Sequence, residues 1–227
     1  MQSDPLEIVI LPTLSATTAG GGSVAVDPPA GAWSSNGTAV VTATPAPGWT
    51  FLHWLGDATG TNPAATVAMS RNISVQAVFG TGLSNRVVGS GSIVASPAGG
   101  MVPFVPFGTR VRLTAVPQAG NYFVQWGSAA SGTNNPLSFA VTNASPVVTA
   151  VFAALPGGTH ALTVVPEGFG AVTASPRAYR YNTGTNVTLT ALPDAGQSFL
   201  GWSGGASGTN NRKRHAEHHW IEGSSSS

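Results

Sequence analysis

The stretch that decides the fold is residues 186–204, which read NVTLTALPDAGQSFLGWSG. From Asn186 to Pro193 the side chains alternate between polar and apolar. A period of two places the apolar set on one face of a β-strand and the polar set on the other. Two large rings, Phe199 and Trp202, follow within a few residues. The stretch therefore predicts a half-buried strand, a loop and an aromatic pair for a small core.

The same features occur three times along the chain. Each time a Gly-x-Gly is followed by a Pro, then by Thr-Ala-x-Pro, then by Phe-x-x-Trp and by Gly-Thr-Asn. The three Trp residues are Trp54, Trp126 and Trp202, and the three Gly-Thr-Asn segments begin at Gly60, Gly132 and Gly208. With the Phe and the Trp counted separately, these are six landmarks in one order, three times over, and they indicate a tandem repeat.

Each repeat is predicted to be built of β-strands. Residues 39–43, 111–115 and 187–191 alternate between apolar and polar side chains, as do the closing runs 73–79 and 148–152. The chain shows no sustained 3.6-residue apolar period with caps, which argues against long helices. Each Gly-x-Gly lies between short apolar runs, where a hairpin turn needs positive φ. A dinucleotide-binding motif would need a third Gly at the right place and a following helix. Neither is indicated here, so this alternative is rejected.

We therefore expect a mainly β chain of tandem small units with little or no helix. The landmarks place one repeat at residues 1–80, a second at residues 81–153 and a third, shorter one at residues 154–211.

The composition limits the classes of function. Charged residues make up 7% of the chain, against roughly 25% in an ordinary soluble domain. A net charge of +1 excludes a strongly basic nucleic-acid binder. The chain has no cysteine, which excludes disulfides, thiolate metal sites and a Cys nucleophile. No apolar run approaches the roughly 18 residues of a membrane helix, so no membrane insertion is expected.

The same composition favours an extracellular location. Low charge with abundant Thr, Ser, Gly and Asn suits a secreted or cell-surface bacterial protein. The opening residues, Met1 to Leu6, carry no basic region and no small-residue cleavage site, so no signal peptide is visible in this chain.

These landmarks resemble the divergent InlB B-repeat domain of bacterial surface and secreted proteins. The third repeat matches its pattern best, at Asn186–Pro193 and Phe199–Gly204. The first two repeats supply its closing motif, as Gln76–Phe79 and Thr149–Phe152. The resemblance covers nearly all of residues 8–211. It implies a small β-grasp-like module used in tandem as a spacer or adhesive domain, and it brings no set of catalytic residues.

The third repeat departs from the pattern after Asn211. Residues 212–227 read RKRHAEHHWIEGSSSS and hold the only Lys of the chain. We interpret this stretch as a truncation scar or a vector-encoded tail, so that two strands of the third repeat would be missing. An open sheet edge would leave the repeat poorly ordered or completed from elsewhere. The candidates are residues 218–221, the N-terminal run 6–11, and a second molecule in a strand-exchanged homodimer through the third repeat.

The tail also contains the sharpest candidate metal site, made of His215, Glu217, His218 and His219. Imidazole and carboxylate groups suit a divalent ion such as Zn or Ni. Two of the His residues have the i, i+4 spacing of catalytic zinc sites. The Glu, however, falls two residues after the first His rather than one, and the stretch lies outside the repeat. A tag-like origin is the favoured interpretation.

A second candidate for chemistry flanks the Trp of the first repeat. His53 and Asp57 could form a base and its orienting carboxylate, and Asp57 could help to hold calcium, although single acids make poor calcium sites. No Ser is placed beside them by a recognisable motif. The aligned positions of His53 in the other repeats are Gln125 and Gly201. A solvated surface pair is therefore favoured.

Aromatic residues outside the repeated pattern are candidates for binding. They are Trp33 and Trp49 in the first repeat, Phe104 and Phe107 in an apolar insertion of the second, and Tyr179 and Tyr181 in the third. Exposed rings stack on sugars or anchor protein partners, whereas the alternative role is to cap small cores. Both interpretations stay open.

The leading functional interpretation is a non-catalytic spacer or binding module for a glycan or a protein, without a cofactor. The alternative is a small secreted hydrolase that uses a divalent metal on an ester or glycan substrate.

Overall fold

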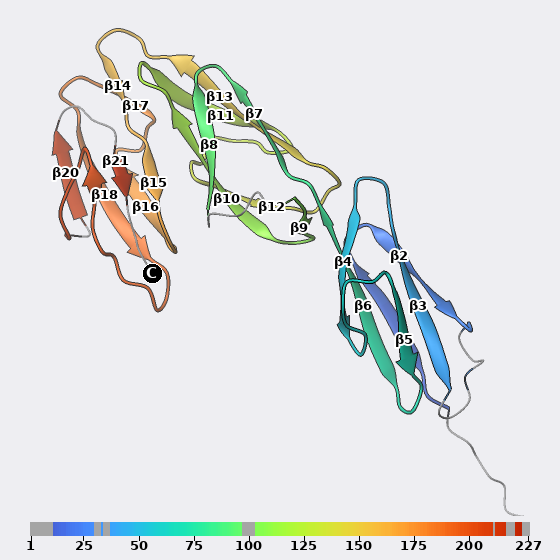
Figure 1. The fold of residues 1–227 in the computed structure, drawn as a ribbon. Helices are drawn as coiled ribbons and strands as arrows, with labels where there is room; N and C mark the ends of the chain where they lie inside the picture. Colours follow the sequence, from blue (N-terminus) through green and yellow to red (C-terminus); the bar gives the residue numbers. More distant parts are fainter. Residues whose placement is uncertain are drawn as a thin grey trace, which may run out of the picture. The chain divides into compact units, whose positions relative to one another are not determined.

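The computed structural model describes residues 11–29, 33, 37–96, 103–210, 212–216 and 221–223 (Figure 1). Within those ranges the chain forms strands and turns and no helix, which confirms the prediction of a mainly β protein of tandem repeats. The chain divides into two compact units. The first unit comprises residues 1–82, 103–109 and 141–145, and the second comprises residues 83–102, 110–140 and 146–227.

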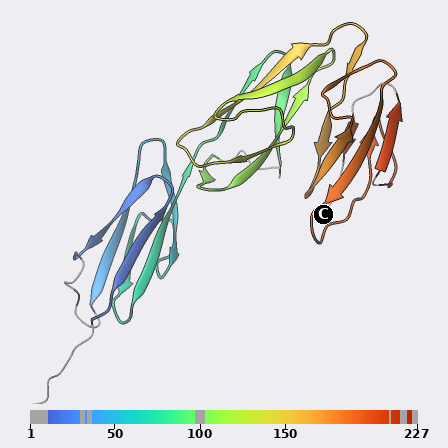
Figure 2. The ribbon, with the colours of Figure 1, turned by 180° about the vertical axis from the view of Figure 1, so that it is seen from behind.

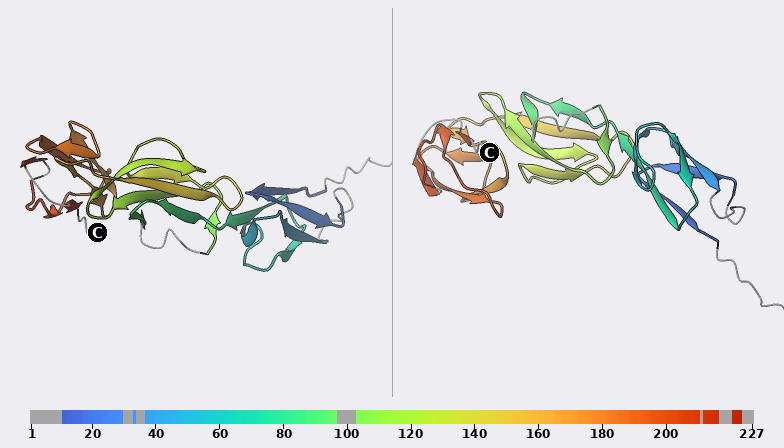
Figure 3. Two further views of the ribbon diagram at one scale, coloured as in Figure 1. Left: turned by 90° about the horizontal axis from the view of Figure 1, so that it is seen from above. Right: turned by 60° about the horizontal axis from the view of Figure 1, so that its bottom comes forward.

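The first repeat consists of two small sheets that face each other. Its strands are β1 (Leu14–Ala19), β2 (Gly22–Asp27), β3 (Thr38–Pro45), β4 (Thr50–Gly56), β5 (Ala64–Ala68) and β6 (Ile73–Thr81). One sheet has the order β1-β6-β4 and the other the order β2-β3-β5. Strands β1 and β6 are parallel, and the remaining pairs are antiparallel. Figures 2 and 3 show the two layers from further directions.

The second and third repeats have the same topology. The second repeat contains β7 (Ser84–Val88), β8 (Gly91–Ser96), β10 (Arg110–Pro117), β11 (Asn121–Ser128), β12 (Leu137–Ala140) and β13 (Val147–Ala154). The third contains β15 (Val164–Pro166), β16 (Gly170–Ser175), β18 (Asn186–Pro193), β19 (Ser203–Gly204), β20 (Arg212–Ala216) and β21 (Ile221–Gly223). In both repeats the sixth strand lies between the first and the fourth, and the third lies between the second and the fifth.

Two short strand pairs add to this pattern. Strand β9 (Val105–Pro106) pairs with the end of β6 and belongs to the first unit. Strand β14 (Thr159–Ala161) pairs with β17 (Arg180–Asn182) in the second unit.

The period-two pattern explains the cores. Strand β3 buries Ala39, Val41 and Ala43 and exposes the side chains between them. Strand β18 buries every second residue in the same way, beginning at Val187. Apolar faces of two sheets pack together because each removes the other from water.

Each repeated Trp holds the Gly-Thr-Asn loop that follows it. The indole N–H groups of Trp54, Trp126 and Trp202 donate to the carbonyl oxygen of the Asn at 3.0, 2.7 and 2.8 Å. The backbone N–H of each Trp donates to the carbonyl oxygen of the loop Gly. All three rings are buried. A buried indole needs a partner for its N–H, so the spacing from Trp to Gly-Thr-Asn is a structural requirement.

Residues 212–216 and 221–223 supply strands where we expected the third repeat to lack them. Strand β20 pairs antiparallel with β18, and β21 pairs with β15 and β19. The stretch interpreted as a scar-like tail therefore extends both sheets of the third repeat. The physical reason is that an unpaired strand edge offers N–H and C=O groups to any extended segment, whatever its side chains. Of the possible fillers, residues 6–10 of the run 6–11 and residues 218–220 of the run 218–221 lie outside the described residues.

Candidate binding site

His53 and Asp57 do not pair with each other. The Oδ1 atom of Asp57 accepts a hydrogen bond from Arg71 Nη2 at 2.6 Å, and Oδ2 accepts one from the Ser74 backbone N–H at 2.7 Å. The hydrogen bond from Arg71, followed by the one from Ser74, lowers the pKa of the Asp57 carboxyl. Both carboxylate oxygens are thus held by groups that fasten the end of β4 to the start of β6, and they do not orient the imidazole of His53.

Only one of the four candidate metal ligands of the tail lies within the described residues. His215 belongs to β20 and stands opposite Val187 in the register. Glu217, His218 and His219 lie outside the described residues. In the described part of the chain, no group of three His, Cys, Asp or Glu side chains is placed to hold a metal ion.

Trp33 and Tyr181 fill equivalent places in the cores of the first and third repeats. Their exposed fractions are 6% and 9%. Trp33 donates its indole N–H to the Pro28 carbonyl at 3.1 Å, and the Tyr181 hydroxyl donates to the Pro176 carbonyl at 2.9 Å. Burial raises the pKa of the Tyr181 hydroxyl. Neither ring offers an open face to a ligand. The shared spacing of five residues after a repeated Pro is the signal that the sequence analysis missed.

Three other aromatic candidates belong to the first unit. Trp49 is half-buried and lies over Gly21, where an added Cβ would come within 2.3 Å of the indole nitrogen. Phe107 packs against Trp49 with the ring centroids 5.9 Å apart. Phe104 and Phe107 both remain substantially exposed. Trp49 and Phe107 therefore form an apolar surface on this unit.

Tyr179 makes contacts inside the second unit. Its hydroxyl donates to the Thr133 carbonyl and accepts a hydrogen bond from the Asn135 N–H at 2.9 Å. Its ring meets Phe123 edge to face, with the centroids 5.3 Å apart. These contacts join the second and third repeats, so Tyr179 has a structural role.

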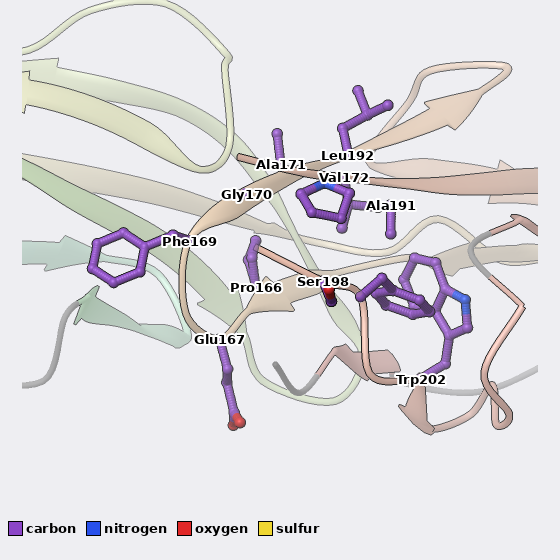
Figure 4. A pocket seen from close by; sticks show the side chains of 12 residues that line it. Pro166, Glu167, Phe169, Gly170, Ala171, Val172, Ala191, Leu192, Ser198 and Trp202 are labelled. Atoms are coloured by element: carbon purple, nitrogen blue, oxygen red, sulfur yellow. The ribbon is translucent and has the colours of Figure 1, made fainter. Parts of the chain in front are cut away.

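An apolar pocket lies in the third repeat (Figure 4). We call it the third-repeat pocket; its cavity volume is about 40 Å³, and the space rises to about 380 Å³ when the open solvent at its mouth is counted. Its lining consists of Pro166, Glu167, Phe169, Gly170, Ala171, Val172, Ala191, Leu192, Pro193, Ser198, Phe199 and Trp202. The rings of Phe199 and Trp202 are 5.0 Å apart.

The lining side chains of the third-repeat pocket point in two directions. Val172 and Ala191 lie on the side of the strands that faces Trp202, whereas Ala171 and Leu192 point to the opposite side (Figure 4). The side chains of Glu167 and Phe169 also point away from the Trp202 ring. Phe169 is 59% exposed. Apart from Ser198, which also lines the pocket, the interior is therefore apolar and aromatic, and its mouth is open to solvent.

Sequence reasoning did not find this pocket. Its interior residues are repeat landmarks, and landmarks that recur in register are expected to be buried. The available signal was the break after Asn211, because this break removes the Phe that ends the closing strand of the first two repeats.

The fold defines a class of protein: a tandem all-β repeat whose units share one topology and one Trp-centred core. The family model of the divergent InlB B-repeat domain matches residues 12–82, 89–156 and 160–218. The chain therefore belongs to the divergent InlB B-repeat family, a repeat module of bacterial surface proteins. No curated protein and no solved structure gives a significant match to the chain. The described ranges contain no helix long and apolar enough to cross a bilayer.

Proposed function

We propose that the chain is a non-catalytic module of a secreted or cell-surface bacterial protein, which spaces neighbouring domains and binds a protein partner. The observation that carries the binding role is the third-repeat pocket. It combines two adjacent rings, Phe199 and Trp202, with an open mouth. Concave apolar surfaces with aromatic walls are preferred sites for anchoring side chains of partners.

A protein ligand is favoured over a glycan by the chemistry of the pocket interior. Sugar recognition relies on polar groups placed beside an aromatic face, because each ring hydroxyl needs a hydrogen-bond partner. The interior side of the third-repeat pocket carries Val172 and Ala191 next to Trp202, and the carboxylate of Glu167 points away. Such a lining suits an apolar side chain.

The spacer role is supported by family membership and by the independence of the cores. The first repeat has a core around Trp54 and Phe79, and the third has one around Trp202 and Leu189. Repeats with their own cores add length without depending on one shared centre.

A peptide-display library and a glycan array, both probed with the whole chain, test the binding role. We expect enrichment of peptides and no glycan signal. Val172→Phe, which places a ring toward the pocket, should abolish peptide binding. Thr173→Phe is the matched control, because this exposed side chain points to the opposite side of the same strand and does not line the pocket. Glycan binding that persists in Val172→Phe would contradict the proposal.

Hydrolysis assays separate this role from the hydrolase alternative. We expect no turnover of ester or glycan substrates by the whole chain, with or without added Zn²⁺. Turnover that is lost with a chelator and with His53→Ala, or on removal of residues 212–227, would establish the hydrolase instead.

A further inference from the structure

The place of the third-repeat pocket is filled by an aromatic ring in the first repeat. Phe79, near the end of β6, is fully buried. Its ring lies 5.9 Å from that of Phe51, which in turn lies 5.3 Å from Trp54. A Cβ added to Gly22 would come within 2.4 Å of the tip of the Phe79 ring. The ring thus covers this Gly and completes a row of three aromatics.

The second repeat has the same arrangement. Phe152 of β13 lies 6.1 Å from Phe123, and Phe123 lies 5.2 Å from Trp126. A Cβ added to Gly91 would come within 2.5 Å of the tip of the Phe152 ring. Gly91 opens β8 as Gly22 opens β2.

Among its described residues, the third repeat has the Gly and two of the rings but no third ring. Gly170, Phe199 and Trp202 occupy the corresponding positions, and all three line the third-repeat pocket. The pocket is therefore the space that Phe79 and Phe152 fill in the other two repeats.

The register of β21 shows why the ring is missing. Ile221 pairs with Val164 of β15, and Glu222 pairs with Ser203 of β19. Glu222 therefore corresponds to Thr149 of β13, which pairs with its two neighbouring strands in the same register. Gly223 then corresponds to Ala150. Counted along the sequence, the position of Phe152 falls two residues after Gly223, where the sequence has Ser225.

We propose that the third-repeat pocket accepts an extended segment of a partner protein with the pattern Val-x-Ala-Val-Phe. The segment takes the place of β21, pairs with β15 and β19, and lays its Phe ring against Phe199, Trp202 and Gly170. Main-chain hydrogen bonds then provide affinity, and the Phe pocket provides specificity. This inference rests on the proposed protein-binding role and names the chemistry of the partner.

The lengths of the strand pairs favour displacement of β21. Strand β21 pairs with β15 over three residues and with β19 over two. The equivalent strand β13 pairs with β7 over five residues and with β11 over seven. An incoming segment of the β13 type therefore displaces only a short strand pairing, and its Phe ring fills the pocket.

The source of the segment is a separate protein with a free strand of this type. A second copy of the chain would have to release β6 or β13, and their Phe rings are almost fully buried in their own repeats. Release of either strand would therefore expose the core of the donor repeat. The free energy lost there exceeds the free energy gained by filling the pocket of the acceptor.

Fluorescence polarisation with the whole chain tests the proposal. The probe is a fluorescein-labelled peptide with the sequence of Pro146–Ala153, PVVTAVFA. The matched peptide carries Phe152→Ser. We expect saturable binding of the first peptide and about ten- to a hundredfold weaker binding of the second, because only the ring fills the pocket. Equal binding of the two peptides would overturn the proposal.

A self-filled variant provides the second arm. Gly223→Ala with Ser224→Val and Ser225→Phe gives the chain its own closing motif. This variant should bind the peptide at least tenfold more weakly and should melt at a higher temperature. Ser224→Phe alone is the control, because a shift of one residue directs a ring to the opposite face of the strand. Peptide binding that is unchanged in the folded triple variant would overturn the proposal, and Val172→Phe provides the same test if that variant does not fold.

Two further outcomes identify where an error would lie. Display-selected peptides that lack the Val-x-Ala-Val-Phe pattern would leave the protein-binding role standing and refute this inference. A concentration-dependent dimer, detected by light scattering and dissolved by the PVVTAVFA peptide, would refute the assigned source by making a second copy the donor.

Discussion

The second and third repeats share a topology but close their sheets with different side chains. In the second repeat, β13 brings Val148, Ala150 and Phe152 into the core, and all three are buried. In the third repeat, the corresponding positions begin with Ile221 and Gly223, and the chain continues into serines. The same backbone pairing therefore completes a core in one repeat and leaves a pocket in the other.

The fifth strands differ in the same way. Strand β12 places Leu137 and Phe139 opposite Leu113 and Val111. Strand β20 places Lys213 and His215 at the equivalent register positions, opposite Leu189 and Val187. Main-chain hydrogen bonds tolerate such exchanges, whereas a packed interior does not. Backbone pairing is therefore enough to extend a sheet, whereas filling a core requires apolar side chains that fit it.

The largest difference between the repeats is expected for their central Trp residues. Trp126→Ala should lower the stability of the second repeat by about 3–5 kcal/mol, because a filled core leaves a large cavity. Trp202→Ala should cost less, since the ring already borders an open pocket. Hydrogen exchange of β10 and β18 in urea measures the two losses separately. Equal losses would mean that the third core is as well packed as the second.

Removal of one ring should convert the second repeat into a copy of the third. Phe152→Ala is expected to cost about 3–5 kcal/mol by emptying the place that the ring fills. The PVVTAVFA peptide should still bind at one site only, because β13 stays paired with β7 over five residues and with β11 over seven. Hydrogen exchange across β10 measures the loss of stability, and calorimetric titration of the whole chain checks the number of sites. Unchanged protection of β10 in the variant would contradict the equivalence of the two places.

Apolar residues in β20 should bring the third repeat closer to the second. Lys213→Leu with His215→Phe restores the residues found at 137 and 139 and is expected to add about 1.5–3 kcal/mol. Arg212→Leu with Arg214→Phe is the matched control, because those positions alternate to the other face. Slower exchange across Val187–Leu192 in the first variant alone would support the register. The same gain in both variants would contradict it.

The smallest predicted effect is a pH dependence of stability that distinguishes the first repeat from the others. Arg71 and Ser74 hold the pKa of Asp57 below its ordinary value of 3.8. A lowered carboxyl pKa contributes stability above the unfolded value, and this stability is lost as the pH falls through the folded value. The first repeat should therefore lose some protection on acidification below about pH 4. Asp57→Asn should remove that dependence, and an unchanged acid profile by hydrogen exchange would argue against it.

Much of the fold could be predicted from the sequence because it depends on local periodicity. Alternation predicted strands such as β3 and β18, and the Trp spacing predicted equivalent cores. The strands β20 and β21 could not be predicted, because backbone pairing leaves no signature in residues such as Lys213 or Glu222. Main-chain edges accept such segments although their side chains suit a core poorly.

The candidate site was less predictable than the fold. Neighbours in sequence suggested a pairing of His53 with Asp57, but Arg71 and Ser74 hold the carboxylate instead. Trp33 and Tyr181 were classed with possible ligand-binding residues, although a shared spacing from a Pro marks both as core residues. The third-repeat pocket depends on an absent ring, which a list of the residues present does not reveal.

The most direct test of the account is hydrogen exchange of the whole chain with and without the PVVTAVFA peptide. We predict faster exchange across Val187–Leu192 than across Val111–Val116 in the free chain, because one core is open and the other filled. Added peptide should slow exchange across Val187–Leu192 and leave Val111–Val116 unchanged. Equal protection of the two strands in the free chain, unaltered by the peptide, would contradict the claim that the third repeat lacks a closing ring.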